Sequence, residues 1–331
     1  MRAAVYRHFG PPEAVRVEEI PKPSPGRGEV LVKVHASTVS AADHRARGRD
    51  VPRGLGMLAA LALGIFKPRH RVLGMDVAGV VEAVGANVTK FRPGDAVIAM
   101  LGASFGGHAE YACVRADGAI TANPRNMTFE DAVTLVFGGL TARVFLGRAG
   151  IKPGDTVLVN GASGAVGTAA VQLAKQLGAH VTGVSSAANA DLVASLGADR
   201  VLDYSAVDFT AEDVTYDVVM DCVGNLPFEG AAASIKPGGA LLLVVADLNG
   251  ILLAPWRSRA SGKLVTAGSV KYTAEDLAFL VHLAELGQYQ AVRERSYDLA
   301  DVVEAHRFVG TGRKRGNVVL RLPAGAAARM S

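Results

Sequence analysis

The feature that most constrains the fold is a series of short apolar runs that alternate with helical patterns from Asp155 onward. In chain order these runs are TVLVN, HVTGVS, RVLDY, DVVMDCV and ALLLVVA. Buried parallel strands appear as continuous apolar runs rich in β-branched residues, because helices cover both faces of their sheet. The sequence therefore predicts an α/β domain with a doubly wound parallel sheet.

The first of these runs ends in the loop GASGAVG, residues 161–167, and a helical pattern follows. Small residues let backbone N–H groups approach a ligand closely, and the positive end of a helix dipole attracts an anion. The pattern is a degenerate form of Gly-x-Gly-x-x-Gly, since Ala162 stands before Gly164 and Gly167. Between a strand and a helix it indicates a pyrophosphate site, and the alternative is a tight turn that binds nothing. We assign to this site Ser163, Gly164, Ala165 and Val166.

The second run identifies the dinucleotide. An acidic residue at its end would bind the ribose 2′-hydroxyl of NAD. The run ends instead in Ser185 and Ser186, whose hydroxyls can donate to a 2′-phosphate. The sequence therefore predicts NADP(H), and in the alternative interpretation the two serines cap the next helix.

The first 120 or so residues have a different pattern. The segments AAVYRHF, EVLVKVHAS, VAGVVEAVG and DAVIAM read as short strands broken by Pro-Gly pairs, which is typical of a small barrel or sandwich. A helical pattern follows Thr128, and the chain ends in a helix, AEDLAFLVHLAELG, and a strand, NVVLRL. The length of 331 residues agrees with two domains.

The composition argues against several classes of protein. The chain has no CxxC pair, so a zinc cluster and a disulfide framework are not expected. The net charge is +4, with a local excess of arginine and lysine between Asp43 and Arg71. This excess is either solvated surface or an attraction for an anionic ligand. Because no aromatic or basic-helix motif accompanies it, we expect no nucleic-acid partner.

The longest uncharged apolar stretch is GLGMLAALALGIF, residues 54–66. It is shorter than the ~20 residues that a membrane helix needs, and no apolar segment of a signal peptide follows the N-terminus. We therefore expect a cytoplasmic protein with no membrane partner. The stretch itself has two interpretations, a helix packed on the core or a flap that partly lines an apolar substrate pocket, and we favour the second.

Several segments together resemble the medium-chain dehydrogenase/reductase superfamily, and within it the zinc-independent, quinone oxidoreductase-like reductases. The resemblance covers nearly the whole chain. The segments that carry it are LGMDVAGVVEAVGANVTKFRPGDAVIA, GLTARVFL, NGASGAVG, LGADRVLDY and AHRFVGTGRKRGNVVLRL.

The resemblance implies a GroES-like, β-rich catalytic domain formed by residues 1–124 and 269–331. It implies a Rossmann NADP-binding domain at residues 125–268, with the active site in the cleft between the two. It also implies a homodimer, which we expect to form by edge pairing of the Rossmann sheets near Ala240–Leu253.

Zinc-dependent members of the superfamily hold their metal with Cys, His and a further Cys or Asp. The matching places here are Ser40, Met75 and the vicinity of Phe137 and Gly138, so we expect no metal. The implied reaction is NADPH-dependent reduction of a small molecule, either a quinone or an α,β-unsaturated carbonyl compound. The alternatives are an enoyl-thioester reductase of lipid or polyketide metabolism and a non-catalytic NADPH-binding protein.

The family pattern places Thr141 and Gly224 beside the nicotinamide. Val245 and Ala246 follow a strand end, where ligands bind in open α/β sheets, although core packing would also place them there. Further cofactor contacts are predicted for Asn189, Tyr204, Arg315 and Asn317. The predicted catalytic residues are Ser40, Asp43 and His44, with solvent as the alternative proton source.

Overall fold

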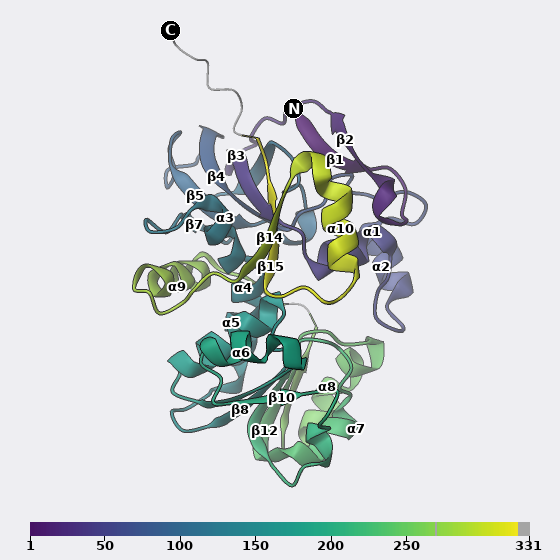
Figure 1. Ribbon diagram of the computed structural model, residues 1–331. Helices are drawn as coiled ribbons and strands as arrows, with labels where there is room; N and C mark the ends of the chain where they lie inside the picture. Colours follow the sequence, from purple (N-terminus) through teal and green to yellow (C-terminus); the bar gives the residue numbers. More distant parts are fainter. Residues whose placement is uncertain (269, 324–331) are drawn as a thin grey trace. The chain divides into compact units, whose positions relative to one another are not determined.

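The computed structural model describes residues 1–268 and 270–323 and divides the chain into two compact units (Figure 1). Unit 1 comprises Met1–Val51, Gly56–Phe137 and the chain from Tyr272 onward, and unit 2 comprises Pro52–Leu55 and Gly138–Lys271. Residues 269 and 324–331, which we predicted to belong to the catalytic domain, lie outside the described residues.

Unit 2 is built on a six-stranded sheet whose strands are all parallel. The strands are β8 (Thr156–Asn160), β9 (His180–Ser185), β10 (Arg200–Asp203), β11 (Tyr216–Asp221), β12 (Ile235–Leu243) and β13 (Leu264–Ala267). Their order in the sheet is β10-β9-β8-β11-β12-β13, which is the doubly wound order that reverses between β8 and β11. The predicted fold class is confirmed for this part of the chain.

One helix precedes the first strand of this sheet, and four helices lie between its strands along the chain. They are α4 (Phe137–Ala149), α5 (Ala165–Gln176), α6 (Ala190–Ser195), α7 (Phe228–Ala231) and α8 (Leu248–Ser261). The core between helices and sheet is apolar, and it includes Leu158, Val219 and Leu241 from three neighbouring strands. Sequence analysis did not predict α8, a helix that contains Pro255.

The expected position of the dimer contact is wrong. Ala240–Leu243 belong to β12, which pairs with β11 on one side and with β13 on the other. Leu248–Leu253 lie in α8. Because neighbouring strands already take the backbone hydrogen-bonding groups of β12, edge pairing is open only to β10 and β13.

Unit 1 contains the β-rich part of the chain. Its strands are β1 (Arg2–Tyr6), β2 (Val15–Glu19), β3 (Glu29–Thr38), β4 (Asp76–Val84), β5 (Ala96–Met100), β6 (Tyr111–Arg115), β7 (Ile120–Ala122), β14 (Arg293–Asp298) and β15 (Asn317–Arg321). The main sheet has the order β14-β15-β3-β4-β5-β7, with β6 also paired to β3, and β1 and β2 form a separate hairpin. Antiparallel pairing of β15 with β3 joins the two ends of the chain in one sheet (Figure 1).

The helices of unit 1 are α1 (Ala41–Gly48), α2 (Gly56–Leu63), α3 (Phe129–Ala132), α9 (Ala274–Glu285) and α10 (Val302–Gly310). Figure 1 shows α10 beside α1, and the two helices are in contact. No residue of α2 is fully buried, and Leu63 at its end packs against the apolar core of unit 1, so the interpretation of residues 54–66 as a helix packed on the core holds for its end and not for its exposed side chains.

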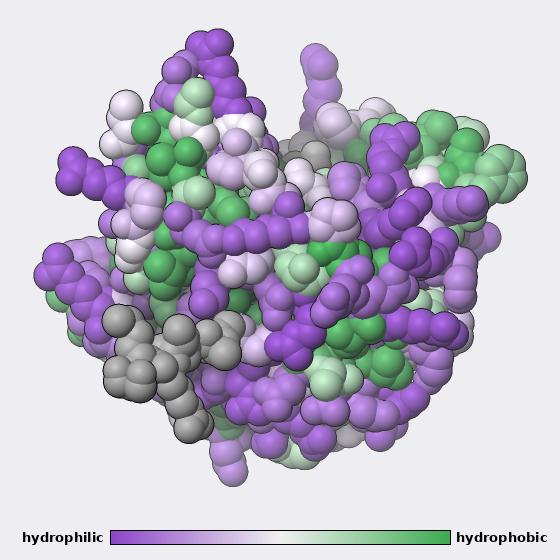
Figure 2. Space-filling model, turned by 90° about the horizontal axis from the view of Figure 1, so that it is seen from above, coloured by the Kyte–Doolittle hydropathy of each residue, from purple (hydrophilic) through white to green (hydrophobic). Residues whose placement is uncertain are grey.

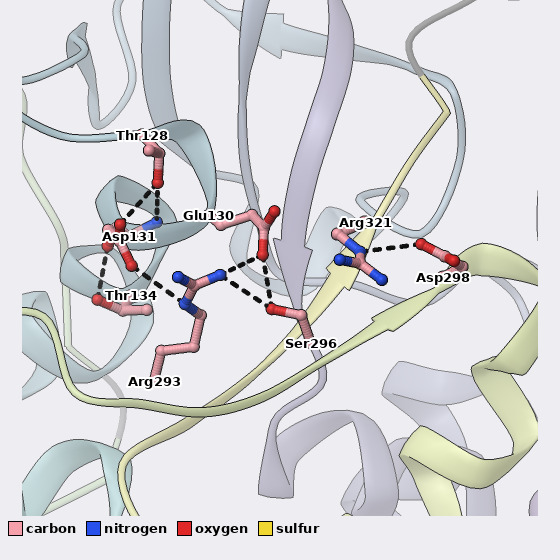
Figure 3. Close-up of polar contacts among 8 residues, drawn as sticks. All are labelled: Thr128, Glu130, Asp131, Thr134, Arg293, Ser296, Asp298 and Arg321. Carbon is pink, nitrogen blue, oxygen red and sulfur yellow. Dashed lines mark hydrogen bonds and ion pairs between the residues drawn. The ribbon is translucent and has the colours of Figure 1, made fainter.

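Residues 125–137 belong to unit 1, whereas we predicted the Rossmann domain to begin at residue 125. Figure 3 shows the guanidinium of Arg293 on β14 between Glu130 and Asp131 of α3. The hydroxyl of Ser296 donates to Glu130 Oε2 at 2.6 Å. The sequence pattern of residues 128–150 predicts one helix. It could not predict these contacts, because they join segments that lie far apart in the chain.

One helical run in the part of the chain that the structure describes is long and apolar enough to cross a membrane by length and composition. It is Phe129–Ala149, and 67% of its most apolar window is buried inside the protein. Such burial is typical of the core helix of a globular protein.

A group of buried histidine and arginine side chains lies between α1 and α10. His306 on α10 is fully buried, and its ring packs edge-on against the ring of His108 at 5.8 Å between centroids. Among the described residues, neither ring nitrogen of His306 has a hydrogen-bond partner. Burial lowers the pKa of His306 well below its usual range, and electrostatic interactions with His108 and Arg47 lower it further. His306 is therefore neutral in the folded protein at neutral pH.

We expect His306 to make the folded state less stable in acid. The unfolded chain binds a proton at His306 below about pH 6.5, whereas the folded chain does not. The contribution of His306 to the free energy of unfolding is therefore constant above about pH 6.5, and it decreases as the pH is lowered further. His306→Leu should reduce the slope of the unfolding free energy by up to about 1.4 kcal/mol per pH unit in this range. Urea denaturation at a series of pH values measures the slope. The exposed His8→Gln should leave it unchanged, and an equal slope in wild type and His306→Leu would contradict the prediction.

Candidate functional site

The strand order of unit 2 reverses at the carboxyl ends of β8 and β11, and two polar residues meet there. Asn160 ends β8, Asp221 ends β11, and Asn160 Nδ2 donates to Asp221 Oδ1 at 2.9 Å. In open α/β sheets this switch point is where ligands bind. Sequence analysis did not select either residue, although each one is the single polar group at the end of an apolar run.

The carboxylate of Asp221 organises the loop that follows β11. It is fully buried and accepts hydrogen bonds from the backbone N–H groups of Val223 at 2.9 Å and Gly224 at 3.1 Å, and from Leu226 at 3.2 Å. Asn160 Nδ2 also donates to Asn225 Oδ1 at 2.8 Å. The loop after β11 is thereby held against the end of β8.

The glycine loop after β8 forms a tight cradle. Gly161 has a φ of +77°, in the left-handed region, and its N–H and that of Ala162 both donate to Val184 O. A Cβ on Gly167 would lie 2.1 Å from Gly161 O, so only glycine fits there. Gly164 caps α5 without a side-chain hydrogen bond, which leaves the first N–H groups of the helix, at Ala165 and Val166, without intrahelical partners. These features fit an anionic group such as a pyrophosphate.

Two of the predicted cofactor residues are brought together beside this cradle. Asn189 Nδ2 donates to Ser163 Oγ at 3.1 Å, which connects the loop after β9 with the loop after β8. The helix α4 also approaches the start of α5, since a Cβ on Gly138 would lie 2.4 Å from Ala165 O. Thr141, on the next turn of α4, is buried.

The predicted 2′-phosphate residues lie at the ends of β9 and β10. Ser185 is buried, its hydroxyl donates to Ser186 O at 3.1 Å, and its carbonyl accepts from Tyr204 N at 3.1 Å. The Ser186 side chain makes no capping hydrogen bond, so the interpretation of this serine as a helix cap is not supported. The side chain of Tyr204 is exposed.

A carboxylate that sequence analysis missed stands beside these serines. Asp203 pairs in register with Ser185 across β10 and β9. Hydrogen bonds from the backbone and hydroxyl of Ser205, and from the backbone of Ala187, lower the pKa of Asp203. Its negative charge opposes a 2′-phosphate, whereas the hydroxyls of Ser186 and Tyr204 favour one.

The remaining predicted cofactor residues of unit 2 lie at the same edge of the sheet. Gly224 lies against Val245, because a Cβ on Gly224 would be 2.6 Å from Val245 Cγ1. Val244 N donates to Asp221 O, which fixes the start of the loop after β12. Val245 and Ala246 are half-buried, so part of each side chain remains accessible to solvent.

The predicted catalytic residues Ser40 and Asp43 form a capping box at the start of α1. Asp43 N donates to Ser40 Oγ at 3.2 Å, and Ser40 N donates to Asp43 Oδ2 at 2.8 Å. Gly74 N donates to the other carboxylate oxygen, Oδ1, at 2.8 Å. Both side chains are buried, and these contacts give them a structural role at the start of α1.

His44 lies on the part of α1 that faces α10, next to Gly310. Its Nδ1 is 3.1 Å from Arg47 Nη2. Burial lowers the pKa of His44, and the positive charge of Arg47 lowers it further, so the imidazole is neutral at pH 7.

Arg315 and Asn317 belong to unit 1, where both contact the region of β14. The backbone N–H of Arg315 donates to Glu294 Oε2 at 2.6 Å, and its Nε lies 3.4 Å from Glu294 Oε1. Asn317 is buried and donates from Nδ2 to Val292 O at 3.1 Å. These contacts hold the start of β15 next to β14.

Two segments of the chain match known protein families. Residues 26–124 match the family described as "Alcohol dehydrogenase GroES-like domain", and residues 196–320 match the family described as "Zinc-binding dehydrogenase". A chloroplast quinone oxidoreductase of Triphysaria versicolor is 33% identical, with 97% of this chain and 98% of that protein covered.

Solved structures of related oxidoreductases are also similar to this chain. The quinone oxidoreductase from Coxiella burnetii is similar with a TM-score of 0.84 at 28% identity, covering 98% of this chain and 99% of that one. A mycobacterial protein solved in complex with NADPH is similar with a TM-score of 0.81 at 30% identity, covering 97% of this chain and 100% of that one.

The residues of this chain do not fit the zinc that one of these family descriptions names. Among the described residues, no group of three or more His, Cys, Asp or Glu side chains is placed to hold a metal ion. At the matching places, Ser40 caps a helix and Met75 packs against the apolar core of unit 1. Neither residue is a zinc ligand of the usual kind.

We expect Gly167→Ala to damage the glycine loop. The added methyl group would overlap Gly161 O, and relief of the overlap should cost about 2 kcal/mol of stability or more and weaken dinucleotide binding. Gly147→Ala is a matched control on the exposed side of α4, with no atom within 4 Å of the added Cβ. It should be neutral or stabilise by about 0.5–1 kcal/mol. Thermal unfolding with and without dinucleotide measures both effects, and equal behaviour of the two variants would contradict the prediction.

We also expect Asp221→Ala to loosen the loop after β11, because three backbone N–H groups and Asn160 lose their acceptor. The cost should be about 2–3 kcal/mol, measured by denaturant unfolding, together with weaker dinucleotide binding. Asp208→Ala removes an exposed acceptor that binds only Thr210 and should cost about 1 kcal/mol or less. A smaller loss for Asp221→Ala than for Asp208→Ala would show that the network does not hold the site.

Proposed function

Because this chain belongs to the medium-chain dehydrogenase/reductase family, in its zinc-independent, quinone oxidoreductase-like branch, we propose that it is an NADPH-dependent reductase of quinones or α,β-unsaturated carbonyl compounds. The observation that carries the proposal is the switch point of unit 2. There the glycine cradle, the Asn160–Asp221 pair and the serine-rich end of β9 occupy one edge of the sheet.

Each part of this edge has a role in holding the dinucleotide. The free N–H groups at the start of α5 bind the pyrophosphate. Ser186 and Tyr204 contact the 2′-phosphate of the adenosine ribose. Asp221 positions the loop that carries Gly224 so that Gly224 and Val245 lie beside the nicotinamide. Ser163 and Asn189 hold the two phosphate-side loops together.

Bound NADPH supplies the hydride. The carbonyl of a quinone or an enone spreads the negative charge that develops on the acceptor, so the reaction does not need the Lewis acid that alcohol oxidation uses. This chemistry agrees with the poor zinc ligands at the matching places. Ser40 and Asp43 orient α1, and we propose that solvent supplies the proton, since burial and Arg47 keep His44 uncharged.

The preference for NADPH over NADH is part of the proposal. It is supported by the missing acid at the end of β9, by the hydroxyls of Ser186 and Tyr204, and by the similar protein that was solved with NADPH. The carboxylate of Asp203 opposes it, so we expect a moderate preference rather than an absolute one.

Titration of the protein with NADPH and with NADH, followed by addition of a simple quinone, tests the proposal. We expect NADPH to bind about tenfold more tightly, which is about 1.4 kcal/mol, and to be oxidised after the quinone is added. Ser186→Asp should abolish the preference, because its charge repels the 2′-phosphate. Ser195→Asp adds the same charge on the exposed side of α6 and should leave the preference intact. Equal binding of both dinucleotides by the wild type would contradict the assignment.

An enoyl-thioester reductase remains the second candidate and a non-catalytic NADPH-binding protein the third. If a carrier-free enone is turned over about as fast as its thioester, the enoyl-thioester reductase is excluded. If any acceptor in a broad screen oxidises NADPH in the presence of the protein, a non-catalytic NADPH-binding role is excluded. A His44→Asn variant with unchanged turnover would support solvent as the proton source.

We also propose a cytoplasmic homodimer without a nucleic-acid partner. The dimer would use a free sheet edge of unit 2, β10 or β13, instead of β12. Size-exclusion chromatography at micromolar concentration tests the oligomeric state.

A further inference from the structure

The short helix α2 and the loop after it present large apolar side chains to solvent. Phe66 is 90% exposed and Met57 is 76% exposed. We call the exposed apolar side chains of this segment the α2 face, and they are Met57, Leu58, Leu61, Ile65 and Phe66. Figure 2 shows hydrophobic residues gathered at the upper right-hand edge of the molecule, on the side where α2 lies in Figure 1, with hydrophilic side chains around them.

The α2 face is held outward by the structure. Leu63, at the end of α2, packs against the apolar core of unit 1. Arg49, which ends α1 in the left-handed conformation, donates from Nη1 to Ile65 O at 2.8 Å. The helix is therefore anchored on one side while its apolar side chains point away from the core. A large exposed apolar patch on a folded protein marks an interaction site.

Positive charge adjoins the α2 face. The sequence from residue 51 to residue 75 contains no aspartate or glutamate. Lys67, Arg69 and Arg71 follow the face directly and are exposed. Arg71 lies near Glu18, whose pKa it helps to lower, whereas no ion pair is found for Lys67 or Arg69 within the described residues. Two cations next to the apolar side chains are thus free for an external anionic partner.

We propose that the α2 face docks the protein on an anionic lipid surface. Exposed Leu, Ile and Phe side chains followed by lysine and arginine on the next segment suit contact with a membrane interface, where apolar groups enter the acyl boundary and cations contact anionic headgroups. A second copy of the chain would bring the same cations and a net charge of +4 to this face, so its charge favours an anionic lipid surface over a second copy.

This inference goes beyond the proposed reductase activity and does not depend on it. It also revises our expectation that the protein has no membrane partner. That expectation rested on the lack of a spanning segment in the sequence, and docking at an interface requires no span.

Flotation of the full chain with lipid vesicles tests the proposal. One set of vesicles is phosphatidylcholine alone and the other also contains phosphatidylglycerol. We expect binding to the second set that is at least about tenfold tighter than to the first and that weakens as salt is added. Leu61→Ser with Phe66→Ser should lower binding to the anionic vesicles by at least about tenfold, and Lys67→Glu with Arg69→Glu should do the same.

Matched controls separate the α2 face from general surface effects. Leu252→Ser with Leu286→Ser removes two exposed leucines elsewhere, and Lys90→Glu with Lys152→Glu makes the same change in net charge elsewhere. Both control variants should bind anionic vesicles like the wild type. All these positions are exposed, so we expect unchanged thermal unfolding in every variant.

Three results would overturn the proposal. The first is no binding of the wild type to either set of vesicles. The second is equal loss of binding in the α2-face variants and in their controls. The third is a self-association of the wild type that Phe66→Ser abolishes while vesicle binding persists, which would assign the face to a second copy of the chain.

Discussion

The buried carboxylate of Asp221 is the constraint on which the candidate site depends. A parallel sheet whose strand order reverses leaves an open crevice at the carboxyl ends of the two central strands. In this chain, Asp221 and Asn160 connect those two ends by a hydrogen bond, and Asp221 also holds three N–H groups of the next loop. These hydrogen bonds therefore join the end of β8, which precedes the glycine cradle, to the loop that carries Gly224.

Unit 1 uses buried polar groups in a different way. The capping box of Ser40 and Asp43 fixes the start of α1, and Asp43 also holds the backbone of Gly74 ahead of β4. Burial raises the pKa of the neighbouring Asp76 to about 7, although Thr38 donates to it from both its backbone and its hydroxyl. In unit 1, the carboxylates of Asp43 and Asp76 therefore hydrogen-bond to neighbouring helices and strands. In the proposed reaction, the reacting groups belong to the dinucleotide and the substrate.

The sequence was informative where the signal is local. The β8–α5 loop, the serines at the end of β9 and the start of a helix after Thr128 all depend on residues within a few positions of one another, and the structure places them as their pattern indicates. It was uninformative where a partner lies far along the chain. The ion pairs of Arg293 with α3, the carboxylate of Asp203 beside Ser185, and the convergence of Asn160 and Asp221 each join segments that no periodicity relates. Sequence analysis also did not predict α8, a helix that contains Pro255.

By itself, the sequence determined that unit 2 is a parallel α/β sheet with a glycine-rich loop between its first strand and the next helix. Apolar periodicity and glycine spacing are properties of short segments, and short segments decide which elements form. Only the tertiary structure decided which strand lies at the edge of the sheet, which polar residues meet at its switch point, and that α2 turns its apolar side chains outward. These features depend on which surfaces become buried when distant segments pack, and burial is a property of the whole fold rather than of any stretch of sequence.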